Sequence, residues 1–144
     1  MNLLLIAHVP PILVSPENTV MDAVDASLPA KVGAVAVVSG EKLVGIFTER
    51  DLMYKVVHNR LDPDQTIIRD VMTTPVITIP PEMPADEVLE MMLDKHIRHL
   101  PISADGIGVD GMLSIRNILQ AMVVDLKDNL LHLENYIGAD NPGG

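Results

Sequence analysis

The chain has 144 residues, of which 10 are basic and 20 are acidic, and its formal net charge is −10. This acidic balance argues against a nucleic-acid partner, because binding a phosphate backbone requires an excess of Lys and Arg. The absence of cysteine excludes disulfides, thiolate nucleophiles and cysteine-based zinc sites. It also suits a reducing cytoplasm, and no stretch approaches the roughly 18 apolar residues of a membrane span. We therefore expect a cytoplasmic protein without a membrane partner.

The first half of the chain contains apolar patterns of both helical and strand periodicity. The Leu3-Leu4-Leu5-Ile6 run is too short for a signal peptide, so it predicts a segment packed on the domain. In chain order we expect a strand or helix within Met1–Ala7, a helix over Val20–Leu28, a hairpin of strands Ala34–Val38 and Leu43–Thr48, and a helix over Glu49–Asn59.

The second half follows the same plan after a polar linker at Leu61–Gln65. We expect a short helical turn at Ile68–Met72, a strand at Val76–Ile79, a helix at Ala85–Lys95, strands at Leu100–Ile102 and Gly111–Ser114, and a helix from Ile115 to Ile137. Gly138 and Pro142 should end that last helix. Its apolar stripe outlasts the first-half counterpart, so part of it should cover a neighbour, either the N-terminal segment or a second subunit.

The two halves are copies of one pattern. Gly45-Ile46-Phe47-Thr48-Glu49-Arg50-Asp51 matches Gly111-Met112-Leu113-Ser114-Ile115-Arg116-Asn117 at an offset of 111 − 45 = 66 residues. Val14–Glu17 matches Ile79–Glu82 at an offset of 65, and Gly33–Val38 aligns with Ile97–Ile102 at an offset of 64. Because a unit of about 60 residues is marginal alone, the units 1–66 and 67–144 should share one core.

In each copy a strand ends at a hydroxyl residue, Thr48 or Ser114, and a helix begins there. Helix N-termini readily bind phosphate and sugar groups, and the carboxylate of Asp51 can accept hydrogen bonds from a vicinal diol. The alternative is that Thr48 and Asp51 only cap a helix. Arg50 and Arg116 recur at matched places and suit an anionic ligand, although each could equally be a solvated surface charge.

No catalytic or metal-binding set stands out in the sequence. His96 and His99 lie three residues apart, but Arg98 stands between them and would oppose a divalent ion, so we predict no metal site. Ser114 is not part of a Gly-x-Ser-x-Gly elbow, and no pair of carboxylates is marked for acid/base work. We predict no catalytic residues, and an enzyme is the least favoured class.

These motifs together resemble a tandem pair of CBS domains, the module named for cystathionine β-synthase. The resemblance spans Pro11 to Ala121 and rests on the repeated Gly-h-h-Thr/Ser-x-x-Asp/Asn motif (h, apolar), on Asp70-Val71-Met72-Thr73-x-x-Val76 and on Arg98-His99-Leu100-Pro101-Ile102. It implies an α/β (α+β) fold of two pseudo-symmetric β-α-β-β-α units packed sheet to sheet, here with an extended C-terminal helix. It also implies up to two clefts for adenosine-containing ligands such as AMP, ADP, ATP, NAD(H) or S-adenosylmethionine, a homodimer, and an unidentified downstream protein that the module regulates.

The resemblance also assigns residues to the two clefts. In the first, Asp51 would hold the ribose hydroxyls, and the other assigned residues are Ile46, Thr48, Arg50, Pro75, Val76, Ile77, Arg98 and His99. Of these, Arg98 and His99 would reach the phosphate. The second cleft would use Met112, Ser114, Arg116 and Asn117, with Ile12 and Leu13 on the base side.

The second cleft departs from the pattern at two points. Asn117 stands where the first copy has an acid, and our alignment places the uncharged Ala34 and Val35 opposite Arg98 and His99. Losing one such contact costs about 1–3 kcal/mol. We therefore predict that the Asp51 cleft binds more tightly. The alternative to a nucleotide sensor is an interaction module with degenerate clefts that works through the long last helix.

Overall fold

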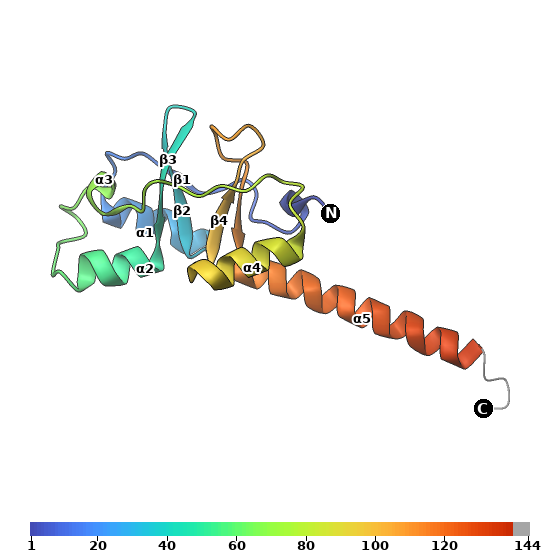
Figure 1. Cartoon of the computed structure of the whole chain (residues 1–144). Coiled ribbons are helices and arrows are strands. Elements are labelled where there is room, and N and C mark those ends of the chain that lie inside the picture. Colours follow the sequence, from blue (N-terminus) through green and yellow to red (C-terminus); the bar gives the residue numbers. More distant parts are fainter. Residues whose placement is uncertain (140–144) are drawn as a thin grey trace.

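The computed structural model describes residues 1–139. Two short sheets lie side by side, helices flank them, and one long helix projects from the body (Figure 1). The elements are η1 (Leu3–Leu5), β1 (Leu13–Val14), α1 (Val20–Ala30), β2 (Ala34–Ser39), β3 (Lys42–Thr48), α2 (Glu49–Asp51), η2 (Leu52–Val57), α3 (Ile68–Val71), α4 (Ala85–Lys95), β4 (His99–Ile102), β5 (Gly111–Ser114) and α5 (Ile115–Ala139). The mixed α/β class and most of the predicted elements are confirmed.

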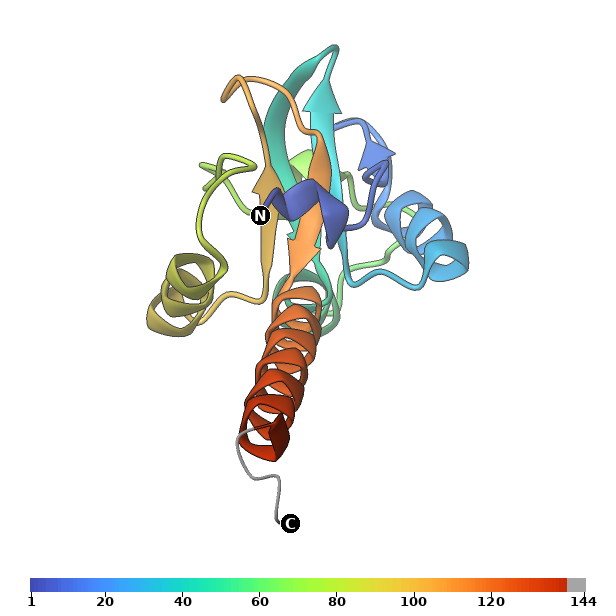
Figure 2. The same ribbon diagram turned by 90° about the vertical axis from the view of Figure 1, so that its right-hand side faces the viewer.

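The two sheets have matching registers. In the first sheet, β1 is parallel to β2, and β2 is antiparallel to β3 with Ala34 opposite Thr48. In the second sheet, β4 is antiparallel to β5 with His99 opposite Ser114. Figure 2 shows the sheets facing each other, with β2 against β5. The repeats are therefore related by pseudo-symmetry and pack sheet to sheet, as predicted.

The predicted strand at Val76–Ile79 is wrong except at its end. Only Ile79 pairs with the second sheet, donating its N–H to the Pro101 oxygen at 3.1 Å and accepting from the Ser103 N–H at 2.9 Å. The next bond of a parallel ladder would require an N–H at position 101, directed to the carbonyl of Ile77. Because proline has no N–H, the ladder cannot extend, and the segment after Pro75 stays outside the sheet.

The helix predicted over Glu49–Asn59 has a different type of turn. It is α-helical only in α2, and η2 continues it as a π-helix, in which the His58 N–H donates to the Met53 oxygen at 3.0 Å. Two turns of apolar spacing do not distinguish these geometries. Met53 and Tyr54, in these π-helical turns, are 61% and 60% exposed.

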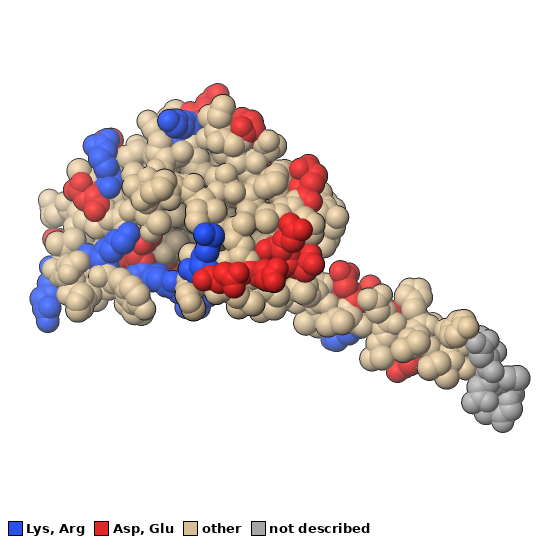
Figure 3. Space-filling model, viewed as in Figure 1, with Lys and Arg blue, Asp and Glu red and all other residues tan. Residues whose placement is uncertain are grey.

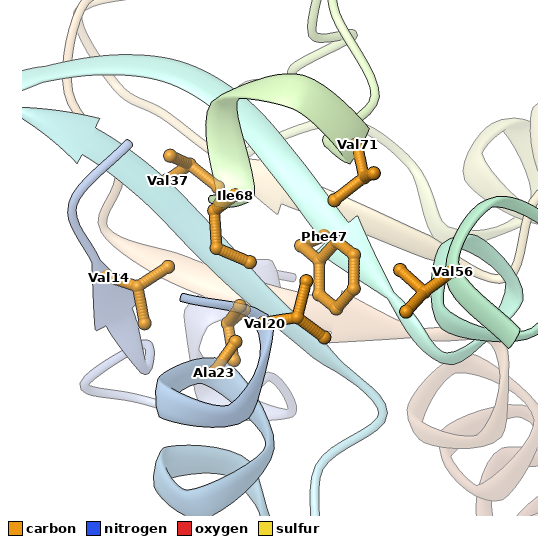
Figure 4. Packing of buried hydrophobic residues seen from close by; sticks show 9 residues of the cluster. Val14, Val20, Ala23, Val37, Phe47, Val56, Ile68 and Val71 are labelled. Carbon is orange, nitrogen blue, oxygen red and sulfur yellow. The ribbon is translucent and has the colours of Figure 1, made fainter. Parts of the chain in front are cut away.

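The buried apolar residues form one main cluster around each hairpin, and the expectation of one shared core stays a prediction. The first core packs the hairpin, α1, η2 and α3 around Phe47 (Figure 4). The second core packs α4 and α5 against β4 and β5 around Leu100 and Leu113. A third, smaller cluster joins the sheets and consists of Ala34, Ala36, Leu43, Ile46 and Met112. Small side chains on β2 let the two sheets approach closely.

The segment before each repeat packs on the other repeat. Ile68 and Val71 precede the second repeat but are buried in the first core. Leu3 precedes the first repeat but is 0% exposed in the second core, and its N–H donates to the Pro81 oxygen at 2.8 Å. The expected packed N-terminal segment is thus confirmed as a short 3-10 helix. A boundary at residue 66 separates the sequence repeats but not their cores.

The repeated glycines explain how these segments reach the sheets. Backbone bonds join Thr73 to Ile46 in the first repeat and His8 to Met112 in the second. A side chain at Gly45 would collide with the sulfur of Met72, and a Cβ at Gly111 would lie 2.9 Å from Leu4 Cδ2. Glycine at the start of each motif therefore makes room for the crossing segment.

The last helix, α5, extends well beyond the body (Figures 1 and 2). Its first turns pack on the second core through Ile115, Ile118 and Met122. It runs through Gly138 to Ala139, and the predicted stop signal at Pro142 lies outside the described residues. No helix within residues 1–139 is both long and apolar enough to cross a bilayer.

Candidate functional site

A cleft of about 410 Å³ opens between the two repeats. One wall is the corner between β3 and α2, the opposite wall is the start of β4, and the segment after Met72 forms the floor. The lining residues are Ile46, Thr48, Glu49, Arg50, Asp51, Met53, Tyr54, Thr73, Pro75, Val76, Ile77, Ile97, Arg98, His99, Leu100 and Pro101. The structure thus brings together all nine residues assigned to the first cleft.

Asp51 is 5% exposed and caps the helix that begins after Thr48. Its Oδ2 accepts from the Thr48 N–H at 3.0 Å and from the Thr48 hydroxyl at 3.3 Å. The Asp51 N–H in turn donates to Thr48 Oγ1 at 3.3 Å. This reciprocal pair is a capping box, so the capping alternative describes part of the role of Asp51.

The second carboxylate oxygen of Asp51 faces the linker. Oδ1 accepts from the Thr73 hydroxyl at 2.8 Å and lies 3.0 Å from Lys55 Nζ. Lys55 Nζ also lies 3.3 Å from Thr73 Oγ1. A carboxylate has about four acceptor positions, and these contacts occupy them. A sugar diol that reaches Asp51 must therefore displace the Thr73 hydroxyl or the Lys55 ammonium.

Cationic groups border this cleft. Arg50 and Arg98 are exposed at its mouth, and Arg50 Nη1 donates to the His96 carbonyl across the two repeats. Figure 3 shows Lys and Arg gathered where α2 and α4 face each other, whereas acidic side chains lie along α4. The cleft lining contains two arginines, Arg50 and Arg98, beside two carboxylates, Glu49 and Asp51, so it is less acidic than the chain as a whole. The two arginines offer partners to an anionic ligand.

The structure places the residues assigned to the second cleft in and just before β1, in β5 and at the start of α5, and a ligand there stays a prediction. Asn117 caps α5 through its Oδ1, which accepts from the Ser114 N–H at 3.0 Å and from the Ser114 hydroxyl at 2.9 Å. Arg116 and Leu13 are exposed, and Ile12 and Ser114 are half-buried. A hollow of about 380 Å³ beside α5 includes Asn117 but none of the other five assigned residues.

The strand register corrects the alignment of Arg98 and His99. Ala34 pairs with Thr48 as His99 pairs with Ser114, so the counterparts of Arg98 and His99 are Gly33 and Ala34. Our alignment used an offset of 64 at this strand, whereas the register gives 99 − 34 = 65, so the alignment was wrong by one residue. Gly33 has no side chain, so the second cleft still lacks a cation at this position.

The model of the CBS domain family matches this chain twice, over residues 6–58 and 68–124. The chain belongs to the CBS domain family. It is a tandem CBS pair, as the repeated motifs predicted, and its first cleft lies between the two CBS repeats.

Relatives and solved structures are similar along most of this CBS pair. An uncharacterized protein of Methanopyrus kandleri is 38% identical over 107 residues, and the mitochondrial CBS domain-containing protein CBSX3 of Arabidopsis thaliana is 36% identical over 126 residues. These matches cover 74% and 84% of this chain but only 55% and 61% of the two relatives. This CBS pair therefore spans a little over half the length of those proteins.

Among solved structures, an uncharacterized conserved protein from Pyrococcus horikoshii has a TM-score of 0.76 and 25% identity, covering 84% of this chain and 91% of that one. A CBS domain pair solved in complex with 5′-methylthioadenosine and S-adenosyl-L-methionine has a TM-score of 0.77 and 25% identity. That match covers 87% of this chain and 98% of the other.

Sequence reasoning missed seven residues that line the CBS cleft. Thr73 was visible in the linker motif, but nothing in the sequence showed that its hydroxyl contacts Asp51. Tyr54 and Met53 reach the cleft because of the π-helical turns, for which the sequence carried no signal. The remaining four are Glu49, Ile97, Leu100 and Pro101. No group of three potential metal ligands occurs among the residues that the structure describes.

His99 predicts a pH dependence of stability for the CBS pair. Burial lowers the pKa of His99, Glu49 opposes that shift, and the charge of Arg98 adds to it. As pH falls, the unfolded chain takes up a proton near the ordinary pKa of 6.5 before the folded chain does. The contribution of neutral His99 is therefore present above that pH and is lost as pH falls from 6.5 toward the folded-state pKa.

We expect wild type to lose more unfolding free energy than His99→Asn between about pH 7.5 and about pH 5.5. Urea unfolding at the two pH values measures this difference. Comparing the two proteins cancels the titration of carboxylates that both contain. Equal losses in the two proteins would contradict the assignment to His99.

Proposed function

We propose that this CBS pair is a regulatory module that binds an adenosine-containing nucleotide, such as AMP, ADP, ATP or NAD(H), and transmits its presence to a partner protein. One observation carries the proposal: a buried carboxylate, Asp51, faces a cleft between the repeats whose opposite wall presents Arg98 and His99. The family model and the relatives that match this chain are of CBS-domain proteins, so we infer a sensor rather than an enzyme. We place it in the cytoplasm on the grounds of its cysteine-free sequence.

The ribose would bind at Asp51. Its two hydroxyls would replace the Thr73 hydroxyl or the Lys55 ammonium, which occupy Oδ1 in the structure. This is an exchange of hydrogen bonds, so the net gain is smaller than the about 1.5–3 kcal/mol of a new charge-assisted bond. Lys55 released from Asp51 could then turn toward a phosphate, which adds a cation to the site.

The adenine would lie on the apolar part of the cleft. Ile46 is buried at one side, and Val76 and Ile77 form the facing segment. Ile77 is 43% exposed, so a flat base could cover apolar surface there. The exposed ring of Tyr54 at the rim offers a second flat surface against the base.

Calorimetric titration of the purified protein with AMP, ATP, NADH and S-adenosylmethionine tests this function. The last ligand is included because a structural relative was solved with it. We expect heat of binding with at least one of these ligands, and unmodified adenosine should bind more weakly than AMP. A protein that gives no heat with any of them at millimolar concentration would refute nucleotide sensing.

Arg98→Ala should lower the affinity for AMP by about 10-fold or more, because it removes a cation beside the phosphate. Its effect on adenosine should be small, since adenosine has no phosphate. Arg116→Ala is the matched control, because Arg116 is equally exposed but lies away from the cleft. Calorimetry with both ligands measures the four affinities, and equal losses for AMP and adenosine would contradict a phosphate-binding role.

A second candidate function is protein interaction alone, and the exposed apolar residues of α5 favour it. Both functions are compatible with a homodimer, which we include in the proposal. The two are distinguished by trimming the chain after Met122. A pure interaction module would lose its dimer and show no nucleotide binding at all, whereas the truncated sensor would keep its nucleotide affinity.

A further inference from the structure

The exposed face of α5 carries apolar residues at alternating intervals of four and three. They are Leu119, Val123, Leu126, Leu130, Leu133 and Ile137, and their exposed fractions range from 46% to 67%. This spacing is a heptad pattern, in which Val123, Leu130 and Ile137 take a positions and the three remaining residues take d positions. Such a seam is typical of a helix that packs against another helix.

The described part of this chain does not cover the seam. Only the first turns of α5 pack on the second core, where Met122 is the last contributor. The N-terminal segment packs against the start of α5, because Leu3 lies in the same core as Ile118. Leu126, Leu130 and Leu133 are therefore left more than half exposed.

We propose that this seam forms an antiparallel two-stranded coiled coil with a second copy of the chain. The charged residues beside the seam favour an antiparallel orientation of the two helices. Lys127 and Glu134 both occupy e positions, which flank the seam on the same side. In an antiparallel pair e positions face e positions, so each Lys127 can meet the partner's Glu134 and two reciprocal ion pairs form.

A parallel pair would lack these contacts. There, e positions face g positions, and the g positions of this helix are Met122, Asn129 and Tyr136. None of these side chains is charged, so Lys127 and Glu134 would have no partner of opposite charge. The same seam is present on both copies, as a twofold interface requires.

The ion pairs also fix the register. Placing Lys127 beside the partner's Glu134 sets Leu126 opposite the partner's Ile137 and Leu130 opposite the partner's Leu133. The end of each helix, Ala139, then reaches the level of the partner's Val124. Met122 is the last α5 residue that packs on the second core, so the overlap lies along the projecting part of the helix. The overlap is about 24 Å at 1.5 Å per residue.

Single-cysteine variants test this arrangement without interference from other thiols, because the chain contains no natural cysteine. We expect that oxidising a mixture of L126C and I137C full-length proteins yields a disulfide-linked heterodimer, whereas neither variant alone yields a linked homodimer. D128C, on the opposite side of the helix, should remain unlinked in every mixture. Linked homodimers of L126C alone would show a parallel pair and overturn the proposal, as would the absence of any linked species.

This inference rests on the homodimer of the proposed function but not on nucleotide binding. Sedimentation of the wild type shows whether the chain dimerises, and it thus distinguishes a failure of the coiled coil from a failure of the homodimer. A wild-type dimer without the heterodimeric disulfide would place the interface on the body and overturn the inference alone, whereas a wild-type monomer would overturn both. We further expect L130D to lose the α5-mediated dimer while its nucleotide affinity stays within about twofold of wild type, because Leu130 is remote from the cleft.

Discussion

Asp51→Asn is expected to weaken AMP binding by up to about 10-fold, because the ribose exchanges bonds at Asp51 and gains less than the about 1.5–3 kcal/mol of a new charge-assisted hydrogen bond. Its effect on folding should be small, since the second repeat already shows that an amide can perform the cap. There, Asn117 Oδ1 accepts from the Ser114 N–H at 3.0 Å, as Asp51 Oδ2 does from Thr48. Calorimetry measures the affinity, and urea unfolding checks that the fold is retained.

The matched control is Asn117→Ala. This change removes the cap of α5 and should cost about 0.5–2 kcal/mol of stability. It should leave the AMP affinity of the first cleft unchanged, because Asn117 does not line that cleft. Equal affinity losses from the two substitutions would contradict our ranking of the clefts. A large fall in stability with Asp51→Asn would show instead that the carboxylate charge, through Lys55, holds the linker in place.

Leu3→Ala is expected to lower the free energy of unfolding by about 2–5 kcal/mol, the range for truncating a buried leucine. Leu3 lies almost at the start of the chain, where substitutions are normally tolerated. Here, however, its side chain is 0% exposed and packs among residues of the second repeat, including Ile79 and Leu113. Urea unfolding followed by circular dichroism measures the loss.

Leu5→Ala is the control for that measurement. Leu5 belongs to the same short helix but is 79% exposed, so its truncation should change stability by no more than about 0.5 kcal/mol. Similar small effects at both positions would mean that the N-terminal segment does not contribute to the second core in solution.

The first cleft could be assembled from the sequence because its chemistry is concentrated in local motifs. Thr48 and Asp51 are three residues apart, so a capping box fixes their geometry whatever the rest of the chain does. Arg98 and His99 stand at the start of a strand whose repeat counterpart was visible. The repeat and these motifs supported the resemblance to CBS pairs, and that resemblance implied the fold and the nine residues that the structure brings together at this cleft.

Features that depend on contacts between distant segments could not be predicted in the same way. The apolar spacing around Leu3 is equally compatible with packing on either repeat, and only the structure shows which one it contacts. The loss of the strand at Val76–Ile79 depends on a missing N–H in its partner strand, at Pro101. The sequence comparison also placed two extra residues in the turn between β4 and β5, whereas the strand registers leave only one there.

The segments that contain Leu3 and Ile68 link the unfolding of the two repeats. Leu3 and Ile68 each lie in the core of the repeat that they do not precede, so loosening one repeat withdraws buried surface from both. Partial opening of a single half is therefore costly, and the pair should behave as one cooperative unit toward denaturant and protease. A small molecule bound in the cleft between the repeats would then protect the entire body against proteolytic cleavage.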